Sequence, residues 1–309
     1  MTKTTKPDLR VEIAGIKFSN PVIGASGTFG YGEEYIKYLD LNRIGGIAVK
    51  GLSSKPNLGN KPPRICETPA GMLNSIGLEN IGVDAFIRDK LPILRKYRTR
   101  VLVNIFGFTE EEYIEVAEKL DSVKGIAGLE VNISCPNIKK GGVSFGKNPR
   151  LTFNLIKKLK ESVSLPLVVK LTPNVSDITE IAQAAEQGGA DALSLINTLN
   201  GMAIDIKTRM PKLGNITGGL SGPAIKPVAL YMVFSVYKKV KLPLIGMGGI
   251  RNFQDAIEFF LAGATAVSVG TANFINPKVL EEIVTGIENF LIGNKIKSVK
   301  ELIGGMEVF

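Results

Sequence analysis

A cysteine stands where a predicted strand gives way to a loop. Residues 128–137 read GLEVNISCPN, and their apolar side chains alternate with polar ones, which is the period of a β-strand. Pro136 has no backbone N–H and keeps Cys135 out of helical geometry, so the strand should end there. The thiol could therefore have a chemical role at a strand end. The alternative is a small buried hydrophobe beside a turn, which is the usual fate of a free cysteine.

Two lysines and four asparagines could bind a ligand. Lys50 lies in the apolar run IAVKG and Lys170 in LVVKLT, where a surface lysine is unexpected. Each could be a fixed cation for an anionic ligand or cofactor; the alternative is a rim lysine whose stem packs on apolar neighbours. The amides that could recognise a planar ring with alternating carbonyl and N–H groups, as in a pyrimidine or a flavin, are Asn74, Asn132, Asn137 and Asn197.

Eight short apolar runs must position these residues. Most are rich in Val, Ile or Leu on both faces, as parallel strands buried on both sides should be. The runs are residues 21–26, 44–51, 101–107, 129–134, 167–172, 192–198, 244–250 and 266–271.

Helical patterns lie between the runs. Thr109 with Glu112 forms a capping box, and Asn148 followed by Pro149 marks the start of another helix. Further amphipathic patterns cover residues 176–187 and 252–261. Strands and helices therefore alternate along the chain.

This alternation favours an α/β fold, a TIM (β/α)8 barrel in a single domain over residues 1–309, entered through a β-hairpin at residues 9–13 and 16–18. A doubly wound sheet is the alternative. In a TIM barrel the chemistry lies at the carboxyl ends of the strands. Two glycine clusters, GMGG at 246–249 and VGT at 269–271, follow the seventh and eighth runs. Barrels often bind a phosphate there through backbone N–H groups, so we expect a phosphate site.

Composition excludes several classes of function. The 309 residues include no histidine and two cysteines, which rules out a Ser-His-Asp triad, the common zinc sites and a disulfide framework; no metal site is expected. The net charge is +9, but basic residues are mixed with acidic ones, so no stripe for nucleic acid stands out. No stretch has the apolar core of a signal peptide or the length of a membrane span, so we expect a cytoplasmic protein.

A set of longer motifs carries a family resemblance. The motifs are NPVIGASGTFGYGEEY (20–35), MLNSIGLEN (72–80), NISCPN (132–137), VKLTPN (169–174), INTLNG (196–201), NITGGLSGPAIKPVAL (215–230), IGMGGI (245–250) and VGTANF (269–274). In this order they resemble dihydroorotate dehydrogenases, most closely the catalytic subunit of the NAD-linked class 1B type. The resemblance covers nearly the whole chain. Cysteine in NISCPN, where the membrane-linked class has serine, supports class 1.

The resemblance implies an FMN enzyme that oxidises (S)-dihydroorotate to orotate in de novo pyrimidine (UMP) biosynthesis. The residues that would hold the flavin are Ser26, Lys50, Gly51, Asn104, Asn132, Lys170, Ile196, Gly222, Gly248, Gly249, Gly270 and Thr271. The residues that would hold the substrate are Lys50, Asn74, Ser75, Ile76, Gly77, Leu78, Asn132, Asn137, Asn197 and Thr198.

The resemblance also implies roles in catalysis. Cys135 would be the catalytic base, and the loop at 138–146 would be a lid over the substrate. Because the chain has no histidine to lower the pKa of the thiol from about 8.5, activity should rise towards alkaline pH. Lys170 would stabilise negative charge on the reduced flavin, and Lys50 would bridge flavin and substrate.

The electrons of the reduced flavin must then leave the chain. Its glycine clusters are assigned to the FMN phosphate and not to an NAD site, and two cysteines are too few for an iron–sulfur cluster. Class 1B implies a partner subunit with FAD and a [2Fe-2S] cluster that reduces NAD⁺, joined to a homodimer of this chain as a heterotetramer.

Other functions remain open from the sequence. They are a class 1A-like enzyme linked to fumarate, a related flavin-dependent pyrimidine reductase, a Schiff-base aldolase that uses Lys50 or Lys170, and a non-catalytic binder of phosphate ligands or nucleic acid. The second cysteine, Cys66, lies in a proline-rich loop far from any predicted strand end. We therefore expect it to be structural.

Overall fold

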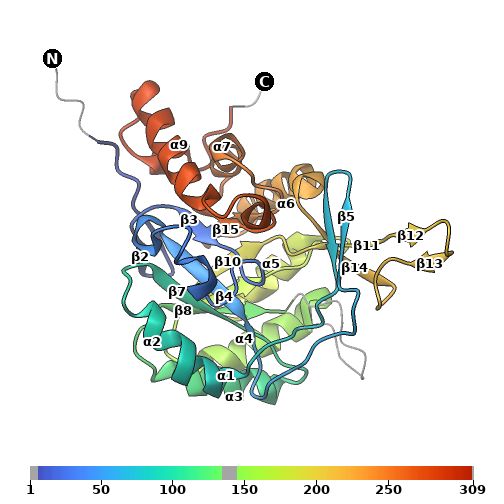
Figure 1. Cartoon of the computed structure of the whole chain (residues 1–309). Helices are drawn as coiled ribbons and strands as arrows, with labels where there is room; N and C mark the ends of the chain where they lie inside the picture. Colours follow the sequence, from blue (N-terminus) through green and yellow to red (C-terminus); the bar gives the residue numbers. More distant parts are fainter. Residues whose placement is uncertain (1–5, 134–144, 308–309) are drawn as a thin grey trace.

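Eight parallel strands close into a barrel, which confirms the predicted TIM-barrel fold (Figure 1). The computed structural model describes residues 6–133 and 145–307. Around the ring the strands are β3 (Val22–Gly24), β4 (Gly46–Leu52), β7 (Arg100–Ile105), β8 (Gly128–Asn132), β9 (Leu167–Lys170), β10 (Ala192–Leu195), β15 (Leu244–Met247) and β16 (Ala266–Val269). Each of the eight predicted apolar runs overlaps one barrel strand, with β4, β7 and β8 each extending one residue beyond the predicted bounds.

The barrel strands are buried on both faces, and this includes charged residues. β9 reads LVVK and β8 reads GLEVN, and every residue of both strands is buried. One set of side chains packs against the surrounding helices while the other fills the barrel interior. The lysine and the glutamate in these strands must therefore have partners, since burying an unpaired charge is costly.

The predicted N-terminal hairpin is present as β1 (Val11–Ile13) and β2 (Ile16–Phe18), and it covers the amino end of the barrel. A Cβ atom on Gly46, at the start of β4, would lie 2.9 Å from the ring of Phe18, and one on Gly128, at the start of β8, would lie 3.0 Å from Ile16. These close approaches pack the apolar face of the hairpin against the first residues of the barrel strands.

Helices surround the barrel, and two of them start at the predicted caps. The side chains of Thr109 and Asn148 each accept a backbone N–H of the following helix, and so does Asn252, which was not predicted as a cap. Among the described residues, no helix combines the length and apolar content that a membrane span requires. The longer helices are α3 (Glu110–Asp121), α4 (Pro149–Ser162), α5 (Ile178–Gln187), α6 (Lys226–Tyr237), α7 (Phe253–Leu261) and α9 (Val279–Gly293).

Shorter helical segments connect these elements. They are η1 (Glu33–Tyr35), η2 (Leu41–Arg43), α1 (Val83–Ala85), η3 (Phe86–Lys90), α2 (Leu91–Leu94), η4 (Phe145–Lys147), η5 (Pro223–Ile225), α8 (Ala272–Ile275) and η6 (Val299–Leu302). Two of them, η5 and α8, follow directly on glycine-containing segments of the predicted phosphate and flavin site.

A second, four-stranded antiparallel sheet lies at the carboxyl end of the barrel and was not predicted (Figure 1). Its strands have few residues, and β11 and β14 contain glycines, so they lack the apolar runs that marked the barrel. Cys66 lies in one of them, which corrects its assignment to a loop. The sheet order is β11 (Leu199–Met202), β14 (Thr217–Ser221), β6 (Gly71–Asn74) and β5 (Ile65–Thr68), and a hairpin of β12 (Ile204–Asp205) and β13 (Met210–Pro211) extends beyond it.

Candidate active site

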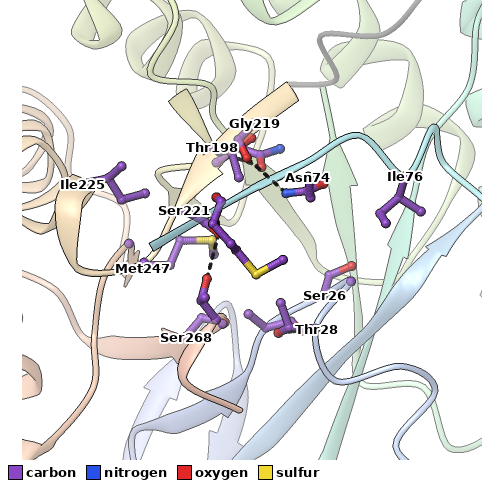
Figure 2. A pocket seen from close by; sticks show the side chains of 18 of the residues that line it. Ser26, Thr28, Asn74, Ile76, Thr198, Gly219, Ser221, Ile225, Met247 and Ser268 are labelled. Atoms are coloured by element: carbon purple, nitrogen blue, oxygen red, sulfur yellow. Dashed lines mark hydrogen bonds between the residues drawn. The ribbon is translucent and has the colours of Figure 1, made fainter. Parts of the chain in front are cut away.

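A cavity of about 320 Å³ lies between the carboxyl ends of the barrel strands and the four-stranded sheet (Figure 2). Its size is within the range of small-molecule and cofactor sites. The predicted site residues that line it are Ser26, Lys50, Gly51, Asn74, Ile76, Gly77, Leu78, Asn104, Asn132, Lys170, Ile196, Asn197, Thr198, Gly222, Gly248, Gly249, Gly270 and Thr271. The structure thus brings together residues that are spread along the sequence from Ser26 to Thr271.

Three predicted site residues are not in this group. Ser75 is buried and lies beside the cavity wall, where its hydroxyl accepts an N–H from Asn60 at 3.0 Å. Its neighbours Asn74 and Ile76 line the cavity. Cys135 and Asn137 lie outside the described residues.

A network of polar side chains crosses the barrel interior beneath the cavity. Glu130 on β8 is 1% exposed and Lys170 on β9 is 6% exposed, and Lys170 Nζ lies 3.6 Å from Glu130 Oε2. Asn104 Nδ2 donates to the same oxygen at 2.5 Å, and Ser194 Oγ donates to Glu130 Oε1 at 3.0 Å. The buried lysine therefore has an anionic partner, and the anion has two further donors.

Two buried polar atoms of the cavity lining have no hydrogen-bond partner among the described residues. They are Asn104 Oδ1 and Ser268 Oγ. Native proteins rarely leave such atoms unpaired, so each is suited to a ligand that brings its own polar groups. A Cβ atom on Gly51 would lie 2.7 Å from Asn104 Oδ1, so only glycine lets the chain approach this amide so closely.

Glycines converge at a second part of the cavity. Gly222, Gly248 and Gly249 have positive φ angles of 94°, 127° and 77°. A Cβ atom on Gly249 would lie 2.9 Å from the carbonyl oxygen of Gly222, so the loop after β15 contacts the segment before η5. Thr271 Oγ1 donates to Ser221 Oγ at 2.8 Å and joins the loop after β16 to the same segment. Three backbone segments thus meet where the sequence predicts a phosphate site.

A lysine near these glycines is held by the neighbouring helix. Lys226 Nζ donates to Asp255 Oδ1 at 2.7 Å and to Glu258 Oε1 at 2.9 Å. Burial lowers the pKa of Lys226, but its bonds to these two carboxylates outweigh burial and leave the pKa above its usual value. Lys226 is therefore paired with two carboxylates of α7, and the backbone N–H groups are the natural donors for an anion at the glycines.

Amide and hydroxyl groups gather on the side of the cavity formed by the small sheet. Figure 2 shows Asn74 and Thr198 beside Gly219. Asn74 Nδ2 donates to the carbonyl oxygen of Gly219 at 3.3 Å, and a Cβ atom on Gly219 would lie 2.0 Å from Thr198 Oγ1. Asn197 Oδ1 accepts the backbone N–H of Thr198 at 2.8 Å. Close packing on a glycine fixes the positions of two predicted substrate contacts.

The second lysine of the cavity lies in a more open setting. Lys50 Nζ is 3.6 Å from Glu79 Oε2, and Arg64 Nη1 donates to the same oxygen at 2.9 Å. The loop beyond Glu79 is anchored by Tyr31, whose hydroxyl accepts the backbone N–H of Ile81 at 3.2 Å. Burial raises the pKa of Tyr31, so the hydroxyl stays protonated at neutral pH.

Two glutamates of the site, Glu130 and Glu79, were not predicted from the sequence. For Glu130 a signal exists, because side chains alternate between the two faces of a strand, which puts Glu130 on the same face as Asn132, a predicted site residue. Glu79 directly follows the predicted substrate segment, but nothing in its spacing indicates that Arg64 would turn it towards Lys50.

Comparison with known proteins assigns the chain to a family. A family model described as dihydroorotate dehydrogenase matches residues 8–291. Over 301 residues the chain is 60% identical to the dihydroorotate dehydrogenase B (NAD(+)) catalytic subunit of Geotalea uraniireducens, covering 97% of this chain and 99% of that protein. The protein of the same name from Caldicellulosiruptor bescii is 55% identical over 301 residues, covering 97% of this chain and all of that protein.

A solved structure shows the same fold. The structure of DHODH from Eimeria tenella in complex with ferulenol superposes with a TM-score of 0.81 and 24% sequence identity. The superposition covers 99% of this chain and 90% of that one. The likeness supports the barrel architecture.

Proposed function

The chain belongs to the dihydroorotate dehydrogenase family, and from this membership we propose that it is the catalytic subunit of an NAD-linked dihydroorotate dehydrogenase. It oxidises (S)-dihydroorotate to orotate in de novo pyrimidine biosynthesis. The observation that carries this proposal is the cavity, which gathers two lysines, four asparagines and the glycines of the expected phosphate site at the carboxyl end of the barrel. An anionic, planar substrate and a phosphate-bearing cofactor both fit these groups.

We propose one FMN per chain. Its phosphate is held by backbone groups of Gly222, Gly248, Gly249, Gly270 and Thr271. The remaining residues for its ring system are Ser26, Lys50, Gly51, Asn104, Asn132, Lys170 and Ile196. The unpaired Asn104 Oδ1 and the positive-φ glycines support this fit, because both suit a ligand with N–H groups at one end and an anion at the other. When bound, FMN supplies the acceptor for the hydride that leaves the substrate.

The substrate is proposed to lie between the ring system of FMN and the small sheet. Lys50 binds its carboxylate, since this lysine lines the cavity and its Nζ lies 3.6 Å from Glu79, which directly follows the predicted substrate segment. Asn74, Asn132, Asn197 and Thr198 hold the amide groups of the ring, together with the segment of Ile76, Gly77 and Leu78 and with Asn137. Several contacts at fixed positions orient the two carbons that lose hydrogen.

Cys135 is proposed as the base. It lies three residues beyond Asn132 in the sequence, and Asn132 ends β8 and lines the cavity. The thiolate takes a proton from the ring carbon next to the carbonyl as the neighbouring carbon, which bears the carboxylate, loses a hydride. The ring thereby gains a carbon–carbon double bond and becomes orotate.

We also propose that the electrons pass to NAD⁺ through a partner subunit that carries FAD and a [2Fe-2S] cluster. The relatives are named as a catalytic subunit, which supports a second subunit. The sequence has two cysteines, fewer than such a cluster needs. In this proposal the chain is one cytoplasmic domain and forms a homodimer within a heterotetramer.

The experiment compares electron acceptors with the purified chain. We expect dihydroorotate to reduce a dye through the single chain, and NADH to form only after the partner subunit is added. Robust NADH formation by the chain alone would contradict the proposed partner. Efficient turnover with fumarate would indicate a class 1A-like enzyme, and reduction of uracil would indicate a pyrimidine reductase.

A further inference from the structure

The barrel interior contains a carboxylate to which the proposed reaction gives no role. Glu130 lies in the middle of β8 and is 1% exposed. A buried carboxylate is costly unless it is paired and hydrogen-bonded, so its presence beneath a cofactor cavity needs an explanation.

The contacts of Glu130 lead to two cavity residues. Its Oε2 accepts from Asn104 Nδ2 at 2.5 Å and lies 3.6 Å from Lys170 Nζ, while its Oε1 accepts from Ser194 Oγ at 3.0 Å. Strand pairing places Asn104 directly opposite Glu130, and Lys170 directly opposite Ser194. Both lysine and asparagine line the cavity.

The first consequence concerns the amide of Asn104. A carboxylate only accepts hydrogen bonds, so the NH₂ group of Asn104 must face Glu130. Asn104 Oδ1 is thereby turned away from Glu130, and it has no partner among the described residues. Glu130 thus makes the free end of this amide an acceptor for an N–H group.

The second consequence concerns the charge of Lys170. Lys170 is 6% exposed, so water screens its charge little, and Glu130 is the carboxylate at 3.6 Å. The pair is neutral as a whole. Lys170 therefore acts on a cofactor in the cavity with a field that Glu130 partly cancels.

We propose that Glu130 is a positioning residue that orients Asn104 and lowers the reduction potential of the bound flavin, because its negative charge opposes that of Lys170. The inference rests on the proposed FMN site. Lys170 favours negative charge on the reduced cofactor, and Glu130 opposes it while keeping lysine and amide in place. Removing the negative charge of Glu130 should make the flavin easier to reduce, whereas removing Lys170 should make it harder to reduce.

The test measures flavin reduction potentials by spectroscopic titration of four proteins supplied with excess FMN. They are the wild type, Glu130→Gln, Lys170→Met and the double variant. In Glu130→Gln the glutamine oxygen can still accept from Asn104 and its NH₂ can donate to the Ser194 hydroxyl, so the change isolates the charge. Glu118→Gln, on the exposed face of α3, is the control for loss of a distant carboxylate.

We expect the reduction potential to be highest in Glu130→Gln and to decrease through the wild type and the double variant to Lys170→Met. At a fixed poise the reduced-to-oxidised ratio of Glu130→Gln should exceed that of the wild type about tenfold, which is ~30 mV for a two-electron couple. Glu118→Gln should match the wild type. If Glu130→Gln does not fold, the double variant takes its place in the test, since replacing both members of a buried pair is tolerated better than removing one. The potential of the double variant must then lie above that of Lys170→Met.

Two failures can be told apart. A wild type that binds no FMN contradicts the proposed function itself. If the wild type binds FMN but the reduction potential of Glu130→Gln is equal to or lower than that of the wild type, the role of Glu130 is overturned and the proposed function stands. Equal potentials for the double variant and Lys170→Met would overturn it as well.

Discussion

Two lysine–glutamate pairs line or underlie the same cavity with the same N–O distance of 3.6 Å, and they differ in burial. The side chains of Lys170 and Glu130 are 7% and 2% exposed, whereas those of Lys50 and Glu79 are 26% and 45% exposed. Breaking a buried pair costs about 3–5 kcal/mol, but an exposed pair contributes about 0–1 kcal/mol. Burial, rather than distance, therefore decides which pair is a fixed part of the site.

The difference suits the two ligands of the proposed reaction. The inner pair is locked by Asn104 and Ser194, and it faces a cofactor that stays bound. The outer pair is half-exposed, and Arg64 keeps a hold on Glu79 when Lys50 moves. Lys50 can therefore exchange Glu79 for the carboxylate of an incoming substrate at little cost.

The largest expected effect comes from a change that leaves both pairs in place. Cys135→Ala should reduce turnover of dihydroorotate by about 10²–10⁴-fold, because a general base contributes that much, while FMN content stays normal. Stopped-flow reduction of the flavin by dihydroorotate measures this. Near-normal turnover would remove Cys135 from the mechanism, and Cys66→Ala, which changes the cysteine of β5, should leave turnover unchanged.

The inner pair gives the next effect. Lys170→Met leaves Glu130 buried with no cation beside it, so the holoenzyme should lose about 3–5 kcal/mol of unfolding free energy, with weaker FMN binding. Denaturant unfolding and a fluorescence titration with FMN measure the two effects. Lys160→Met is a matched control, because Lys160 pairs with Asp191 at 2.7 Å on the surface and should cost less than about 1 kcal/mol. Equal losses of unfolding free energy in Lys170→Met and Lys160→Met would contradict the claim that burial decides which pair stabilises the protein.

The outer lysine should affect the substrate more than the fold. Lys50→Met removes a charge-assisted contact of about 1.5–3 kcal/mol, so the KM for dihydroorotate should rise about 10–100-fold, with a smaller loss of unfolding free energy than Lys170→Met. Steady-state kinetics with a dye as acceptor give the KM. An unchanged KM would show that Lys50 does not bind the substrate.

Glu79 should give the smallest effect. Glu79→Gln removes the competitor of the substrate for Lys50, so the KM for dihydroorotate should fall by less than about fivefold, a change within 1 kcal/mol. The difference from the wild type should shrink as salt is added, because exposed charges are screened. A rise in KM would contradict the exchange between Glu79 and the substrate.

The sequence predicted the barrel and the lining of its cavity, but not the network beneath it. Apolar runs such as LVVK mark buried strands whatever their neighbours are, and the carboxyl-end rule then places Lys170 in the site. The partner of Lys170 depends on strand register, which aligns β7, β8, β9 and β10 and which no local pattern specifies. The small sheet was missed for a related reason, since β14 pairs with β6 across about 145 residues of chain.

The most direct test of the account is an anaerobic titration of the purified chain, supplied with FMN, with (S)-dihydroorotate while the flavin absorbance is followed. The cavity as described predicts one FMN per chain and stoichiometric bleaching of its absorbance, with no NAD⁺ or partner subunit present. A chain that binds no FMN, or whose bound flavin stays oxidised at saturating dihydroorotate, would contradict the account.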